Sequence, residues 1–307
     1  MAVNRWIVTT TINSPTDAIR KYDALPDWNL LVVGDRRTPE YKLDRGVYLD
    51  WKYQKDKYPN LCSLVGSDNT QRGRMIAFIE AHRRGAELIA TIDDDCDPYP
   101  GWPGEIYVGR SDIPCVFYEC NDPVFNPFAG LFEHPPRGFP PQIRDGIYHS
   151  SLRAISPLIQ ENFWDGEADI DACWRVHGSK DERCGCKEPF ASAALSPVNT
   201  QNTIIHGSVL KDHCGELPFV GHVGDVWAGY LFQAHHPCAT IYAPATVRHW
   251  QDRTLDSVLK DLEEELFSYK HSLSFVEGLR RLGPDGISQL LPGKTVDAIK
   301  IYRSYFE

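Results

Sequence analysis

Long apolar runs are absent from this sequence. No stretch of about 18 or more consecutive apolar residues occurs, so we expect no transmembrane helix. The first residues, Met1–Trp6, lack the apolar segment of a secretory signal peptide and lead directly into strand-like sequence. Together these absences predict a soluble, cytoplasmic protein that does not bind membranes.

The chain also has fewer basic than acidic residues. The chain has 32 Lys and Arg residues against 42 Asp and Glu residues, which gives a net charge of −10. This balance argues against a general nucleic-acid-binding surface or an anionic-membrane surface. An anionic substrate would therefore need a local cation, which a metal bound by acidic residues can supply.

The nine cysteines do not form a zinc-binding pattern. Cys184 and Cys186 are separated by one glycine, and this spacing matches no structural zinc motif. The odd number of cysteines and the missing signal peptide favour reduced thiols over disulfides.

Hydrophobic periodicity predicts an α/β fold. The chain has 307 residues and is 42% hydrophobic, enough for a sizeable core. We expect strands over 6–12, 29–35, 61–65, 88–92 and 115–119, and helices over 71–84, 254–281 and 296–305. The alternation indicates strand–helix–strand units of the doubly wound type. We expect residues 1–253 to form the main domain and residues 254–307 a helical extension packed on it.

A long segment without regular structure interrupts this pattern. Residues 121–146 are rich in proline, glycine and aromatic side chains. The segment is too apolar for a disordered linker, so we expect an ordered loop packed over a site.

Three consecutive carboxylates are the clearest chemical signal. The apolar run 88–92 reads as a buried strand and ends in Asp93, Asp94 and Asp95. Open α/β sheets bind ligands at the carboxyl ends of their strands. Adjacent carboxylates repel one another unless a cation neutralises them, and a hard divalent ion prefers oxygen ligands. The triplet is either a metal site for a nucleoside diphosphate or a solvated acidic turn.

Several further segments match a known family in the same order along nearly the whole chain. With the Asp triplet they are 8–16, 27–35, 136–140, 165–172, 199–203, 224–229 and 261–265. On these segments the chain resembles the STELLO-type glycosyltransferase-like domains. It is more distantly similar to the reversibly glycosylated polypeptides, the plant UDP-arabinopyranose mutases. The resemblance implies a GT-A fold, an α/β nucleotide-diphospho-sugar-binding fold with a mixed central sheet.

The resemblance implies a divalent metal, Mn²⁺ or Mg²⁺, at the Asp triplet. Asp93 and Asp95 would bind the metal and the ribose and diphosphate groups. Asp94 would face another way, among the nucleotide-binding residues. His249 would complete the metal shell, and neutral imidazole suits Mn²⁺. The alternative for His249 is an ordinary core or surface histidine.

Further positions are expected to hold the nucleotide. Thr9, Thr10 and Thr11 lie at the end of the first strand and Asp35 ends the second, where uracil and ribose would bind. The threonines are equally explained by β-propensity. Arg72, at the start of a helix, would contact the diphosphate.

Most of the remaining candidates have two interpretations. Arg137 is expected among the residues that bind the nucleotide sugar. Arg144, expected to be catalytic, aligns with the arginine that the mutases modify with sugar and would bind the diphosphate; a surface salt bridge is its alternative. Asp225 is either a general base for the acceptor or a helix cap. Asp169 and Asp171 are candidates for the sugar pocket or for a structural turn.

The favoured function is a metal-dependent glycosyltransferase with a UDP-sugar donor and an unknown hydroxyl acceptor. One alternative is a UDP-sugar mutase that changes the ring form and needs no acceptor. Another is a non-catalytic nucleotide-sugar-binding scaffold, although the retained Asp93, Asp95 and Asp225 argue against complete loss of activity. A homo-oligomer stays open.

Overall fold

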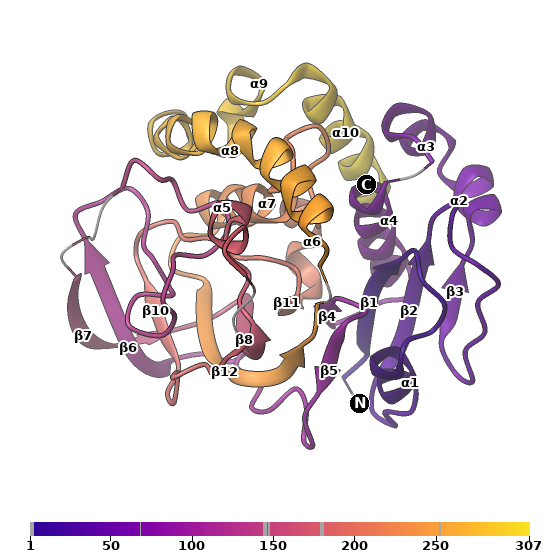
Figure 1. Cartoon of the computed structure of the whole chain (residues 1–307), viewed down its shortest axis with the longest axis horizontal. Helices are drawn as coiled ribbons and strands as arrows, with labels where there is room; N and C mark the ends of the chain where they lie inside the picture. Colours follow the sequence, from indigo (N-terminus) through magenta and orange to yellow (C-terminus); the bar gives the residue numbers. More distant parts are fainter. Residues whose placement is uncertain (1–2, 68, 144–145, 147, 179–180, 252) are drawn as a thin grey trace.

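A twisted mixed sheet with helices packed along it makes up the molecule (Figure 1). The structure is a computed structural model, and it describes residues 3–67, 69–143, 146, 148–178, 181–251 and 253–307. Arg144, a predicted catalytic residue, lies outside the described residues.

Within the described ranges, 12 strands join one sheet in the order β3-β2-β1-β4-β11-β8-β12-β10-β6-β7, with β5 added to β12 and β9 to β8. The strands are Arg5–Thr11 (β1), Asn29–Gly34 (β2), Val47–Leu49 (β3), Leu88–Ile92 (β4), Cys96–Pro98 (β5), Ile113–Cys120 (β6), Tyr148–Ile155 (β7), Ile159–Glu167 (β8), Asp181–Glu182 (β9), Phe190–Ser192 (β10), Asn202–His206 (β11) and Thr240–His249 (β12).

The two halves of the sheet differ in strand direction. Strands β3, β2, β1 and β4 are mutually parallel, so their carboxyl ends meet at one edge. Strand β11 is antiparallel to both β4 and β8, whereas β12 is parallel to β8. The predicted α/β fold with a mixed central sheet is confirmed by this arrangement.

The helices cover the sheet and continue past it at the carboxyl-terminal end of the chain. The α-helices are Asp17–Asp23 (α1), Trp51–Lys57 (α2), Pro59–Val65 (α3), Thr70–Arg83 (α4), Ala172–Arg175 (α5), Leu210–His213 (α6), Gly224–His235 (α7), Leu255–Leu282 (α8), Ile287–Leu290 (α9) and Gly293–Arg303 (α10). Short 3₁₀ turns lie at Gly207–Val209, Pro284–Gly286 and Ser304–Phe306. Among the residues described, no helix combines the length and apolar character needed to span a bilayer.

The strand predicted over 61–65 is wrong, because this segment is helix α3. Pro59 occupies the first helical turn, a position that proline favours since its missing N–H needs no partner there. Leu61, Cys62 and Val65 are buried, and their spacing is that of one helix face.

The predicted packed loop is confirmed for residues 121–143. Two isolated bridges, at Val124 and Pro136, are its only β pairing there. Phe125, Phe128 and Phe139 are nonetheless buried in the core. All nine cysteines are free thiols, as predicted.

Helix α8 packs on the main part of the chain through helices α5 and α7 (Figure 1). The rings of Trp227 in α7 and Phe275 in α8 stack with centroids 4.1 Å apart. The Trp227 indole N–H also donates to the Ser272 hydroxyl at 3.1 Å. The division of the chain at residue 253 stays a prediction.

We expect Phe275→Ala to lower the free energy of unfolding by about 3–5 kcal/mol, because it removes a fully buried ring and leaves a cavity beside Trp227. Urea unfolding monitored by fluorescence measures this. Leu152→Ala is the matched control, since this side chain is 83% exposed on edge strand β7 and its loss should change little. Equal midpoints for Phe275→Ala and the wild type would contradict the packing described.

Candidate active site

A polar pocket of about 230 Å³ opens at the carboxyl ends of β1 and β4. Its walls come from the end of β1, helix α4, the Asp triplet, the packed loop, the turn before β11 and the segment that leads into the start of α7. The lining residues are Thr10, Thr11, Ile12, Asn13, Thr70, Arg74, Asp93, Asp94, Asp95, Arg137, Thr200, Glu216, His222 and Asp225. Most are polar, as a site for a charged ligand requires.

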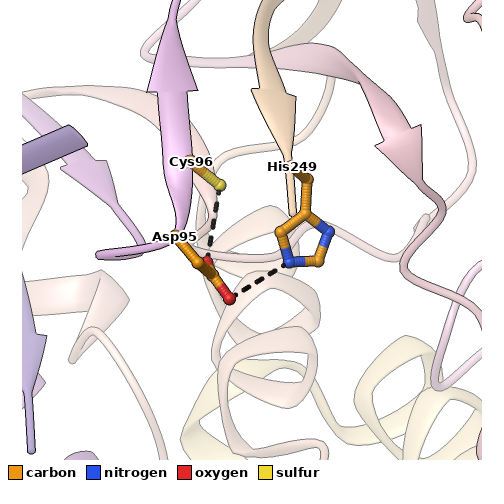
Figure 2. Close-up of side chains that lie close together, drawn as sticks. All are labelled: Asp95, Cys96 and His249. Atoms are coloured by element: carbon orange, nitrogen blue, oxygen red, sulfur yellow. Dashed lines mark hydrogen bonds and ion pairs between the residues drawn. The ribbon is translucent and has the colours of Figure 1, made fainter. Parts of the chain in front are cut away.

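Asp95 and His249 come together at this edge, as Figure 2 shows. Strand β5 pairs with β12 so that Cys96 lies opposite His249, and Asp95 directly precedes Cys96. His249 Nε2 lies 3.4 Å from Asp95 Oδ2. Within the described chain, the ligand atoms of Asp95, Cys96 and His249 all lie within 4.8 Å of one another.

The environment of His249 suits a metal ligand. Its Nδ1 lies 2.8 Å from the Glu167 carbonyl oxygen, to which it can only donate, so the neutral ring leaves the Nε2 lone pair free. Nε2 is buried and has no hydrogen-bond partner among the described residues. Burial opposes protonation, but Asp95 and the Glu167 carbonyl outweigh it and raise the pKa of His249 above its ordinary value.

These donors fit a divalent metal better than they fit a zinc thiolate site. Burial, followed by the nearby carboxylates Asp95 and Asp93, raises the pKa of the Cys96 thiol well above its usual range. A protonated thiol is a weak ligand, so Asp95 and His249 are the effective donors. An orphaned buried imidazole nitrogen facing a carboxylate is the arrangement that Mn²⁺ would complete.

Asp93 is held by an arginine that the sequence interpretation missed. Arg74 of α4 donates from Nη2 to Asp93 Oδ1 at 2.7 Å, and its Nη1 donates to Thr91 Oγ1 and the Ile92 carbonyl. Burial and Asp95 together raise the pKa of Asp93 to about 6, against the effect of Arg74. Asp93 therefore lines the pocket as the ion-pair partner of Arg74, and it does not belong to the Asp95–His249 group.

Asp94 has different contacts from its two neighbours. Its carboxylate accepts hydrogen bonds from the Thr11 hydroxyl and from the Asn13 amide. Thr10 and Thr11 line the pocket, whereas Thr9 is fully buried beneath it. The end of β1 therefore forms one wall, with Asp94 fixed against it.

The structure does not bring Arg72 or Asp35 to the pocket lining. Arg72 is fully buried, donates to Gln54 Oε1 and the Gly66 carbonyl, and stacks on Trp51. Arg72 and Arg74 are separated by roughly 200° around the helix, so only one of them can face the strand ends. Asp35 lies at the end of β2 and accepts hydrogen bonds from Arg37.

Arg137 joins two buried carboxylates. It donates from Nε and Nη2 to Asp169 at 2.9 and 3.1 Å, and from Nη1 and Nη2 to Asp225 at 3.0 and 2.9 Å. Burial opposes ionisation, but Arg137 holds the pKa of both Asp169 and Asp225 below the ordinary value. Asn199 and Arg175 give Asp169 further hydrogen bonds.

Asp171 lies behind this network. Its Oδ1 accepts the Gly138 N–H at 3.1 Å, and it lines a separate cavity with Phe139 and Tyr269. Burial, followed by the Glu265 carboxylate, raises the pKa of Asp171 to about 8.

Glu216 is a second pocket residue that sequence reasoning missed. It lies in the segment between β11 and α7, where no helical or strand period marks its direction. Burial, followed by the Asp225 charge, raises the pKa of Glu216 to about 8. A single acidic residue in an irregular segment gives no signal by itself, so only the folded arrangement reveals it.

Over 253 residues, the chain is 21% identical to probable glycosyltransferase STELLO1 and 22% identical to STELLO2, both from Arabidopsis thaliana. The resemblance to STELLO-type proteins is confirmed. Each match covers 75% of this chain and 33% of the relative, so the chain spans about a third of the length of these curated relatives. No family model matches the chain.

Two solved structures are similar to this one at low identity. Glucosyl-3-phosphoglycerate synthase from Mycobacterium tuberculosis is 10% identical, with a TM-score of 0.45 over 89% of this chain and 80% of that chain. A197 from STIV is 13% identical, with a TM-score of 0.34 over 81% of this chain and 87% of that chain.

The raised pKa of Asp171 predicts a pH-dependent stability. Between about pH 4 and 8 the native carboxyl keeps a proton that the unfolded chain has lost, so unfolding releases a proton. The free energy of unfolding therefore falls as pH rises through this window, by up to about 1.4 kcal/mol per pH unit. Asp171→Asn should remove this contribution and make the pH dependence shallower. Urea unfolding at pH 5, 6.5 and 8 tests this, and parallel pH profiles for the two proteins would contradict it.

Proposed function

We propose that this chain is a metal-dependent glycosyltransferase that uses a nucleotide-diphospho-sugar donor, with UDP as the nucleotide. The observation that carries the proposal is the buried His249 Nε2, which makes no hydrogen bond within the described residues and lies 3.4 Å from Oδ2 of the pocket residue Asp95. The similarity to the probable glycosyltransferases STELLO1 and STELLO2 supports the same class of reaction.

Asp95 and His249 would hold the metal, and Asp93 would lie beside it in its ion pair with Arg74. A divalent cation bound there supplies positive charge that offsets the charge developing on the departing nucleoside diphosphate. The chain itself is acidic, with a net charge of −10, so this local cation would make the pocket compatible with an anionic donor. Mn²⁺ suits a mixed oxygen and imidazole donor set.

The nucleoside would bind along the wall formed by the end of β1. Thr10, Thr11 and Asp94 offer hydroxyl and carboxylate groups there, which can hydrogen-bond to ribose. Arg137 uses its guanidinium on Asp169 and Asp225, so its part would be to position Asp225 in the pocket. A contact between Arg144 and the diphosphate stays a prediction.

Calorimetric titration of UDP tests the proposal. We expect binding in MnCl₂ and little binding in EDTA. Asp95→Ala and His249→Ala should each weaken the metal-dependent binding by on the order of 10- to 100-fold or more, since disturbing even the outer shell of a metal site has that effect. His149→Ala, on the exposed edge strand β7, is the matched histidine control and should bind as the wild type does.

The outcomes separate the candidate functions. A UDP affinity that is unchanged both by removal of the metal and by Asp95→Ala would refute the proposed site. Failure of UDP, GDP, CDP and dTDP alike would remove the nucleotide assignment. Conversion of UDP-arabinopyranose to its furanose form without an acceptor would identify a mutase instead of a transferase.

A further inference from the structure

His222 faces the candidate pocket from the segment that leads into α7. It lines the pocket with Asp225 and Glu216, and about a third of its side chain, 32%, is exposed. Its carbonyl oxygen accepts a hydrogen bond from Arg137, the guanidinium that also holds Asp225. The backbone of His222 is therefore fixed by the same ion-pair network that shapes the pocket.

The residue before it brings this segment against helix α8. Gly221 has a φ of +74°, and a Cβ there would lie only 2.4 Å from the Glu264 carbonyl oxygen. Only glycine allows this close approach between the two backbones. The Gly221 carbonyl also accepts a hydrogen bond from Gln71 of α4 at 3.3 Å.

Two carboxylates of α8 face His222 as a result. Asp261 and Glu265 are one helical turn apart, and Asp261 Oδ1 and Glu265 Oε1 each lie 3.7 Å from His222 Nδ1. Within the acidic run 261–265, Asp261 is half-buried and Glu265 is buried, and both turn toward His222.

Each carboxylate is held in place by its other oxygen. Glu265 Oε2 accepts hydrogen bonds from the Ala172 N–H at 2.7 Å and the Tyr269 hydroxyl at 3.0 Å. Asp261 Oδ2 is paired with Arg253. Glu265 Oε1 and His222 Nδ1 are both buried without a hydrogen-bond partner in the described part of the chain, and they face each other.

This arrangement orients the imidazole. With Nδ1 buried against two carboxylates, the neutral ring is favoured with its proton on Nδ1. Because Nδ1 is the buried nitrogen of a partly exposed side chain, we infer that the neutral ring presents its Nε2 lone pair on the exposed side. The arrangement is similar to that of a catalytic triad, in which a carboxylate holds the imidazole in one orientation.

Asp225 is poorly suited to the same task. Both of its oxygens accept hydrogen bonds from Arg137, and this pairing disfavours protonation of the carboxylate. A general base needs a free lone pair within reach of the acceptor. The imidazole of His222 offers one, whereas the pairing with Arg137 makes the Asp225 carboxylate a weaker base.

We propose that His222 is the general base that activates the acceptor hydroxyl, with Asp261 and Glu265 as its positioning residues. This inference rests on the proposed glycosyltransferase function. The acceptor O–H bond breaks and its proton passes to Nε2, while the acceptor oxygen forms a bond to the anomeric carbon of the donor sugar. The bond from that carbon to the diphosphate oxygen breaks, and its electron pair leaves on the nucleoside diphosphate. The imidazolium later returns the proton to water.

The test measures UDP release from UDP-glucose, UDP-galactose and UDP-arabinopyranose in MnCl₂, with glycerol as the acceptor. We expect His222→Ala to lower kcat by roughly 100-fold or more, the usual contribution of a general base, while UDP affinity stays within threefold of the wild type. Added imidazole should restore part of the rate. Glu265→Gln and Asp261→Asn should lower kcat more than they change KM, and His149→Ala should match the wild type.

Several results would overturn the assignment. These are a wild-type rate in His222→Ala, a loss fully explained by weaker UDP binding, or no rescue by imidazole. If His222→Ala does not fold, His222→Asn replaces it, and thermal melting checks both variants.

The tautomer of His222 gives a readout that does not need turnover. Nitrogen-15 NMR should show the proton on Nδ1 in the wild type and a shift toward Nε2 in Glu265→Gln. If the proton lies on Nε2 in the wild type and stays there in Glu265→Gln and Asp261→Asn, the role of the two carboxylates is overturned. Wild-type protein that binds UDP but releases none from any donor would reject the transferase proposal, while the tautomer still reports on the arrangement around His222.

Discussion

The buried ion pairs of Arg137 are the interaction on which the pocket depends. One guanidinium joins the packed loop to Asp169, which follows β8, and to Asp225 at the start of α7. Three segments far apart in sequence therefore meet in one fixed geometry. Loss of one partner from such a network leaves an uncompensated buried charge, which costs about 3–5 kcal/mol. The network thus sets the position of Asp225 and of the His222 backbone together.

Strand register supplies the other fixed part of the site. Cys96 pairs with His249 across β5 and β12, and His249 pairs with Gly166 across β12 and β8. These pairings place the His249 ring between Asp95 and the Glu167 carbonyl, so that one nitrogen is anchored and the other faces the carboxylate. A one-residue slip would turn the imidazole to the opposite face of the sheet.

Those parts of this architecture that hydrophobic periodicity and strand ends encode could be predicted from the sequence. The strands over β1, β2 and β4 carry clear apolar runs, and the Asp triplet follows the last of them, so the fold class and the position of the triplet could be predicted. His249 was reached only through the family resemblance. Helix α3 was misread because five apolar-rich residues fit a strand as well as a helix. Arg74 and Glu216 were missed for a different reason. The direction of Arg74 depends on the rotation of its helix, and that of Glu216 depends on the path of an irregular segment. The residue type alone encodes neither.

Helix α8 contributes Asp261 and Glu265 to the surroundings of the pocket, and Gly221 packs against its backbone. Helix α8 thus supports a residue of the pocket wall and does more than cover the sheet. A ligand that orders His222 in the pocket would bind more tightly when α8 is docked. The bound ligand would in turn stabilise the docked position of α8 by mass action. Ligand affinity and the docking of the C-terminal helices are consequently two sides of one linked equilibrium.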